Sequence, residues 1–153
     1  MDDFAALGGG RLPSPIVHEC VLQCRAEDAF ETYAGRIGEW WDPRYTANAE
    51  TLETVVIEPR VGGRMYARHA DIGEDDWGAV TIWEPGRRLV HTFTLAQDPA
   101  CPSEVDVEFA PGDGDGCTMR FAHGGWNEAN VAVRPKFGDW HVMLDRFAAL
   151  TQV

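Results

Sequence analysis

The sequence predicts an α+β protein, in which a curved antiparallel sheet of about six or seven strands packs on one long C-terminal helix. Most segments between residues 51 and 126 alternate apolar and polar residues, as strands with one buried face do. Turns rich in glycine, proline and aspartate separate these segments, and such hairpin joints make neighbouring strands antiparallel. Helical spacing occurs in residues 26–41 and 135–152. A sheet with one apolar face and a helix with one apolar stripe form a natural pair of layers.

The chain begins with a segment, residues 1–13, that we expect to be a flexible leader, because glycines and prolines resist regular structure. Residues 14–153 are then expected to form a single domain. Residues 16–24 are rich in β-formers and predict the first strand. Residues 26–41 follow with helical spacing, which Gly35 and Gly38 divide into two short helices. The apolar stripe of these helices consists of Phe30, Tyr33, Ala34 and Ile37.

The middle of the chain predicts six further strands with an acidic loop at residues 71–76. These strands are expected at residues 51–59, 64–70, 77–85, 87–95, 103–111 and 117–126. The strict alternation of the last two strands predicts which side chains face the C-terminal helix. They are Val105, Val107, Phe109, Met119 and Phe121, while the alternating acids Glu104, Asp106 and Glu108 should face solvent.

The final helix is expected from Pro135 to about Gln152, with the proline in its first turn. Its apolar residues recur at steps of three and four, so Trp140, Leu144 and Phe147 should be buried against the sheet. A strongly curled sheet cannot touch a straight helix along its whole length. We therefore expect a cavity between the sheet and this helix.

Charge and composition exclude several partners. Thirteen Lys and Arg against 25 Asp and Glu give 13 − 25 = −12, which repels nucleic-acid phosphate and anionic lipid. No apolar run approaches the ~18 residues of a membrane span. The first residues are acidic where a signal peptide has lysine or arginine. We expect a cytoplasmic protein with no nucleic-acid or membrane partner.

The four cysteines do not form a recognisable metal motif. Cys20 and Cys24 are four positions apart, Cys101 and Cys117 lie far from them, and the chain contains no CxxC pair. The cysteines are expected to be free thiols in a reducing compartment. We predict neither a metal nor a cofactor.

Several segments resemble, in order, one known group of proteins. They are AFETYAGRIGEWW, VGGRMY, WGAVTIWEPGRRLVHTF, SEVDVEF, GCTMRFAHGGW and FGDWHVMLDRF. Together they are similar to the START-like helix-grip (SRPBCC) superfamily, and most to homologues of the C-terminal domain of the heat-shock ATPase activator. The resemblance covers about Pro15 to Leu150 and implies the helix-grip fold. Members of this superfamily bind lipids, aromatic polyketides or hormones, cyclise polyketides or assist chaperones, so the resemblance leaves the function open.

Three classes of function therefore remain. The first is a module that binds a small hydrophobic or amphipathic molecule in the cavity, and we favour it. The second is an enzyme of the cyclase or hydrolase kind that uses pocket histidines. The third is a chaperone-interacting domain, which is disfavoured because the co-chaperone has an additional N-terminal domain and only about a dozen residues precede the expected fold here. A homodimer is left open.

Three histidines, His18, His91 and His123, lie at the apolar positions of their strands. Such imidazoles could bind a ligand, transfer protons or hold a metal, or they could be core histidines bonded to the backbone. The sequence does not show whether they converge.

The adjacent tryptophans of GEWWDPRY cannot both enter one core position, because neighbouring side chains on a helix diverge by about 100°. Trp40 continues the apolar stripe and should be structural. Trp41 should line the cavity or its mouth, with His91 or His123 among its polar neighbours. The residues predicted to bind the ligand are Trp41, His91, Phe93, Met119, His123 and Trp140.

Overall fold

A computed structural model describes residues 13–152 and contains one seven-stranded sheet, in which all neighbouring strands are antiparallel. The strands are β1 Ile16–Leu22, β2 Leu52–Ile57, β3 Arg64–His69, β4 Gly73–Glu84, β5 Arg88–Phe93, β6 Ser103–Pro111 and β7 Cys117–Gly124. Strands β2 to β7 pair in chain order, and β1 pairs with β7, so β1 and β2 are the edges of the sheet. The predicted fold class is confirmed. Residues 1–12 of the predicted leader lie outside the described part, and the division into leader and domain stays a prediction.

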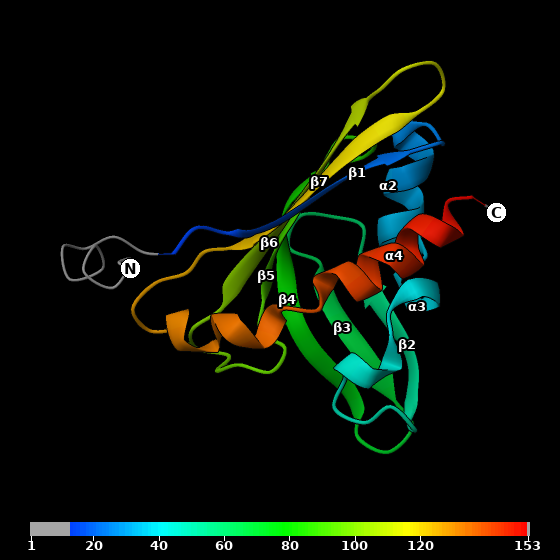
Figure 1. Ribbon diagram of the computed structural model, residues 1–153. Helices are drawn as coiled ribbons and strands as arrows, with labels where there is room; N and C mark the ends of the chain where they lie inside the picture. Colours follow the sequence, from blue (N-terminus) through cyan, green and yellow to red (C-terminus); the bar gives the residue numbers. More distant parts are fainter. Residues whose placement is uncertain (1–12, 153) are drawn as a thin grey trace.

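The helices gather on one face of the curled sheet (Figure 1). They are α2 Ala26–Gly35, α3 Ile37–Trp40, η1 Pro43–Tyr45, η2 Val131–Phe137 and α4 Trp140–Leu150, where η denotes a 3-10 helix. Helix α4 crosses the sheet and contacts both α2 and α3. Among residues 13–152, no helix is long and apolar enough to cross a membrane.

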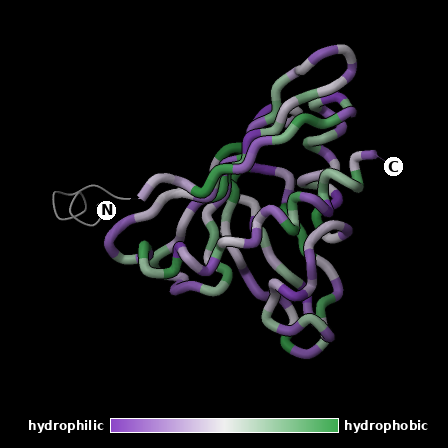
Figure 2. The backbone as a smooth tube through the Cα atoms, viewed as in Figure 1, coloured by the Kyte–Doolittle hydropathy of each residue, from purple (hydrophilic) through white to green (hydrophobic). Residues whose placement is uncertain are grey.

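The predicted inward face of β6 and β7 is confirmed. Val105, Val107 and Phe121 are fully buried, whereas Glu104 and Glu108 are exposed. This alternation gives the strands their mixed colours in Figure 2. Asp106 also points outward, but it is half-buried because Arg88 Nη2 donates a hydrogen bond of 2.8 Å to its carboxylate.

The predicted division of residues 26–41 into two helices is also confirmed. Helix α2 ends at Gly35 and α3 begins at Ile37. The second glycine has a packing role, because a Cβ atom at Gly38 would clash with the Thr54 side chain of β2. A small residue here lets α3 lie directly on the edge strand.

The last helix begins later than predicted. Pro135 lies within the 3-10 helix η2, and α4 begins only at Trp140. Tertiary contacts explain the break, since Phe137 and Trp140 both pack against His123, with ring centroids 4.7 and 5.7 Å away.

The predicted acidic loop at residues 71–76 is mostly strand. Strand β4 begins at Gly73, which has a φ of 78°, and Glu74, Asp75 and Asp76 pair with β3. Acidic residues are poor β-formers, but here β3 places Arg64 beside them, and its Nη1 lies 3.0 Å from both Glu74 Oε1 and Asp76 Oδ1. The first strand, in turn, ends at Leu22 rather than at Cys24.

We predict unequal costs for two truncations in α4. Phe147 is fully buried against the rings of Tyr33 and Trp40, with centroids 5.4 and 5.7 Å away, so Phe147→Ala should lower the free energy of unfolding by about 3–5 kcal/mol. Leu144 borders a pocket of about 110 Å³ between α4 and β1, so Leu144→Ala should cost only about 2 kcal/mol. Urea denaturation measures both. Equal costs would mean that α4 is packed uniformly along its length.

Candidate functional site

The two adjacent tryptophans enter different parts of the interior. Trp40 Nε1 donates a hydrogen bond of 3.1 Å to the Tyr33 carbonyl, and its ring packs on Tyr33 and Phe147. Arg146 Nε of α4 donates a bond of 2.8 Å to the Trp40 carbonyl. Trp40 therefore joins α2, α3 and α4, as predicted for a structural residue.

Trp41 follows the end of α3 and turns toward the other end of the interior. Its ring lies 5.0 Å from Trp77 and 5.8 Å from Trp140, and Nε1 donates a bond of 3.1 Å to the Tyr45 carbonyl. The next residue, Asp42, accepts a hydrogen bond from Arg44 N and so begins η1. Both indoles are almost fully buried. Trp41 is buried because α4 and the sheet cover it.

A pocket of about 260 Å³ lies next to Trp41. Its walls come from four places in the chain: η1, the end of β5 with the residues after it, η2 and the start of α4. The lining is mainly aromatic and aliphatic. It consists of Trp41, Arg44, Tyr45, Thr46, Phe93, Leu95, Ala96, Lys136, Phe137, Asp139, Trp140 and Met143.

The polar groups of the pocket come from η1, η2 and the start of α4. Tyr45 Oη donates a hydrogen bond of 3.1 Å to Asp139 Oδ2, and burial with this contact raises the pKa of Tyr45. Lys136 Nζ donates a bond of 3.2 Å to the Ala96 carbonyl. Arg44 is engaged by Asp42, with Nη2 2.7 Å from the carboxylate. The pocket therefore joins an apolar interior to exposed charged side chains.

The predicted site residues divide into two groups. Trp41, Phe93 and Trp140 line the pocket, but His91, Met119 and His123 do not. The two histidines instead contact Phe93, with ring centroids 6.0 and 5.4 Å away, and they are buried, so a role for them in ligand binding stays a prediction. Met119 borders the separate small pocket between β1 and α4, together with His18. The alternation of side chains along a strand identifies which residues face inward, but it does not show where along the curled sheet each of them lies.

His123 is the centre of a buried hydrogen-bond chain. Trp140 Nε1 donates to His123 Nδ1 over 3.0 Å, so the neutral imidazole carries its proton on Nε2 and donates it to Ser103 Oγ over 2.6 Å. Ser103 Oγ also accepts from Gln97 Nε2 over 2.9 Å and lies 3.3 Å from the Phe93 carbonyl, to which its hydroxyl donates. In this tautomer His123 cannot accept a proton from Ser103.

Burial keeps both inner histidines neutral. It lowers the pKa of His123 to about 3, with the nearby His91 and Arg134 acting in the same direction. It also lowers the pKa of His91 to about 4, although the hydrogen bond of 2.7 Å from Nδ1 to the Thr92 carbonyl partly opposes this. Both residues are therefore core histidines, and both ring nitrogens of His123 have hydrogen-bond partners.

Several pocket residues escaped the sequence analysis. Arg44 and Tyr45 stand three and four positions after Trp41, in a turn that carried no periodic signal. Phe137 and Lys136 lay in the segment assigned to the long helix, where an irregular turn was not expected. The available signal was the step of three positions between two aromatic residues, Phe137 and Trp140.

Metal ligation finds no support in the part of the chain that the structure describes. No group of three or more His, Cys, Asp or Glu side chains within residues 13–152 is arranged to hold a metal ion. The four cysteines are free.

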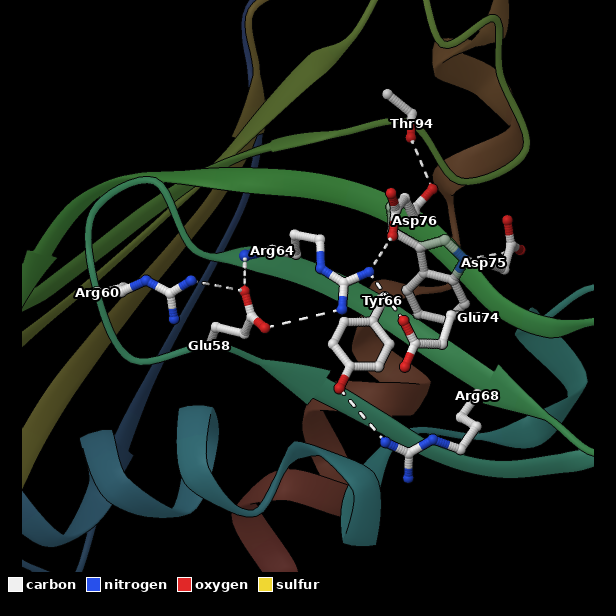
Figure 3. Close-up of polar contacts among 10 residues, drawn as sticks. Glu58, Arg60, Arg64, Tyr66, Arg68, Glu74, Asp75, Asp76 and Thr94 are labelled. Atoms are coloured by element: carbon white, nitrogen blue, oxygen red, sulfur yellow. Dashed lines mark hydrogen bonds and ion pairs between the residues drawn. The ribbon is translucent and has the colours of Figure 1, made fainter.

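The arginines of β3 lie on the face opposite the core. Arg64 and Arg68 share this face with Tyr66, which is itself buried, while Met65 and Ala67 belong to the core. The Arg64 guanidinium lies 4.2 Å from the centre of the Tyr66 ring, within a group of acidic side chains (Figure 3). This network stabilises the β2–β4 part of the sheet and adds no cation to the pocket.

A curled antiparallel sheet that wraps a C-terminal helix, with short helices after its first strand, is the START-like helix-grip fold. The family model described as "Activator of Hsp90 ATPase homolog 1-like protein" matches residues 25–152. The chain belongs to this family. A comparison with curated proteins finds no significant match.

Solved structures share this fold. Protein MLL2253 from Mesorhizobium loti is 24% identical, with a TM-score of 0.64 over 90% of this chain and 96% of its own. The anthrahydroquino-gama-pyrone synthase Txn09, complexed with SUM, is 26% identical, with a TM-score of 0.60 over 90% and 96%. The Aha1 dimer from Colwellia psychrerythraea is 15% identical, with a TM-score of 0.66 over 92% and 98%.

We predict that the buried histidines make the fold acid-sensitive. The pKa values of His91 and His123 in the folded protein lie below the ordinary value near 6.5. Below pH 6.5 the unfolded chain therefore binds more protons than the folded one, and the free energy of unfolding decreases as the pH is lowered. Each of the two histidines should lower the free energy of unfolding by about 1–2 kcal/mol between pH 7 and pH 5. His123→Gln should reduce this loss in urea denaturation, relative to its own stability at pH 7. His141→Gln, at an exposed position, is the control and should leave the loss unchanged.

Proposed function

We propose that this protein binds a small amphipathic molecule, mainly apolar, in the pocket beside Trp41. One observation carries the proposal: five aromatic rings line a space of about 260 Å³, those of Trp41, Tyr45, Phe93, Phe137 and Trp140. Aromatic walls with a few polar groups at one side are typical of sites for small apolar ligands.

The hydrogen bonds of the walls define the chemistry of the ligand. Both indole N–H groups are occupied, that of Trp41 by the Tyr45 carbonyl and that of Trp140 by His123. The inner walls thus offer ring faces and no free donor, which suits a flat ring system or an alkyl chain. The exposed Lys136 and Asp139 are available to the polar end of the ligand.

A reaction on the bound molecule is the second candidate. The similarity to a synthase at 26% identity favours it, and so does the Tyr45–Asp139 hydrogen bond at the pocket. The acid–base groups would then be Tyr45, Asp139 and Lys136. The inner histidines are unsuited to this role, because both are buried and both nitrogen atoms of His123 are engaged in hydrogen bonds.

The remaining partners are weaker proposals. The likeness to an Aha1 dimer is at 15% identity and carries the fold alone, so a chaperone partner and a homodimer both stay predictions. A dimer through antiparallel pairing of two β1 edges centred on Glu19 is disfavoured, because it would set these like charges opposite each other. A cytoplasmic location is supported by four free thiols.

We predict that the neutral fluorescent probe N-phenyl-1-naphthylamine binds in this pocket. Phe137→Ala should raise its Kd about tenfold, because one wall of the pocket loses a ring contact of roughly 1–2 kcal/mol. Trp83→Ala is the matched control, since Trp83 is half-buried against Phe30 and does not line the pocket. Equal probe affinity in wild type and Phe137→Ala would contradict the proposed site.

A second prediction separates the two tryptophans. Trp40→Ala and Trp41→Ala should both lower the melting temperature, because both rings are buried. At a temperature where both variants are folded, only Trp41→Ala should weaken probe binding strongly, since Trp41 lines the pocket. Circular dichroism establishes folding, and titration of the probe measures the Kd. Loss of binding in Trp40→Ala alone would mean that the two roles are reversed.

A further inference from the structure

Three of the four thiols gather at one corner of the sheet, away from the proposed pocket. Cys117 begins β7 and is fully buried, and its partner across the ladder is Leu22, the last residue of β1. Cys20 and Cys24 flank Leu22 at a distance of two residues on either side. Cys101, in contrast, lies in the connection between β5 and β6.

The backbones approach closely at this corner. A Cβ atom at Gly116 would lie 2.9 Å from the Leu22 carbonyl oxygen, so glycine permits the contact. In Figure 1 the end of β1 lies beside β7 and close to the start of α2. The thiol of Cys24 therefore enters a tightly packed junction of three elements.

Cys20 and Cys24 both lie two positions from Leu22, the residue opposite Cys117, but only Cys20 is held in the ladder. Cys20 remains in the regular ladder opposite Met119, so it is a diagonal neighbour of Cys117, at about 7–8 Å between Cα atoms. A disulfide requires about 4.4–6.8 Å. Cys24 lies in a bend after the strand has ended, and it packs against the core. Because Cys24 lies in this bend, the distance between its Cα atom and that of Cys117 is not fixed by the pairing of β1 with β7.

The electrostatics of Cys117 agree with a thiol–thiol contact. Burial, together with the smaller effect of the neighbouring Cys24, raises the pKa of its thiol to about 11. Cys117 is thus a buried, protonated thiol. Cys24 is only half-buried, so it is the thiol that a small oxidant can reach.

We propose that Cys24 and Cys117 are a site of reversible oxidation that closes to a disulfide in the presence of a peroxide. The Cys24 thiolate attacks one peroxide oxygen, the O–O bond breaks, and Cys24 becomes a sulfenic acid as hydroxide leaves. The Cys117 sulfur then attacks the Cys24 sulfur, and the S–S bond forms as the S–O bond breaks. The thiol proton and the departing hydroxide give water, so two thiols and hydrogen peroxide yield one disulfide and two waters.

Because both cysteines lie at one corner of the same molecule, the second step is intramolecular, which offsets the weak nucleophilicity of a thiol with a raised pKa. The bond would close a loop of most of the chain and hold the junction of β1 and α2 on β7. Constraining so long a loop in the unfolded chain should raise the melting temperature by roughly 5–10 °C.

The test uses the full reduced protein, treated with hydrogen peroxide and then denatured in N-ethylmaleimide. Non-reducing proteolysis and mass spectrometry should find one peptide pair joined through Cys24 and Cys117, with the other two cysteines alkylated. The oxidised protein should melt higher than the reduced one, and dithiothreitol should reverse both changes.

Two variants serve as matched controls. Cys24→Ser, at the half-buried position, should abolish both the cross-link and the rise in melting temperature. Cys101→Ser should retain both. The proposal is overturned if Cys24 and Cys117 remain alkylated in the wild type, if the bond joins Cys20 or Cys101 instead, or if the cross-linked protein melts no higher than the reduced one.

Discussion

The hydrogen bond from the Trp140 indole to His123 is the interaction on which the pocket end of the molecule depends. It attaches the first residue of α4 to β7 and determines where the helix begins. It also determines the tautomer of His123, whose other nitrogen donates to Ser103 at the start of β6. Through Gln97 the same chain holds the connection after β5. The helix, two strands and a loop thus share one buried network with every donor directed at an acceptor.

This network has a direct consequence for the pocket. Trp140 is both the anchor of α4 and a wall of the pocket, so its ring face is presented in one orientation. Phe93 has a similar double position, with Trp41 on one side and His123 on another, at centroid distances of 6.5 and 5.4 Å. Preorganised aromatic walls lower the cost of ordering side chains when a ligand binds. The buried hydrogen-bond network therefore holds the walls of the pocket rigid, although the pocket itself contains few hydrogen bonds.

The charge of the protein differs between the outer surface and the pocket. The acidic side chains that produce the net charge of −12 lie largely on the outer face of the sheet, in hairpins and on exposed helix positions. On β3 and β4 they surround Arg64, which offsets part of their mutual repulsion. The pocket region combines Lys136 and Arg44 with Asp139, so the local charge is mixed. An apolar ligand with a polar end meets both signs there.

Sequence alone determined the layers of this protein, and tertiary structure decided the site. Period-two alternation in β6 and β7 identified Val105, Val107 and Phe121 as core residues, because burial on one face leaves no other register. The apolar stripe around Phe147 identified the covering helix for a similar reason. Alternation does not say where along a curled sheet a residue lies, so His91 and His123 were placed at the cavity although Phe93 and Trp140 separate them from it. The break between η2 and α4 likewise depends on contacts of Phe137 and Trp140 with a histidine more than ten residues away, which local spacing cannot register.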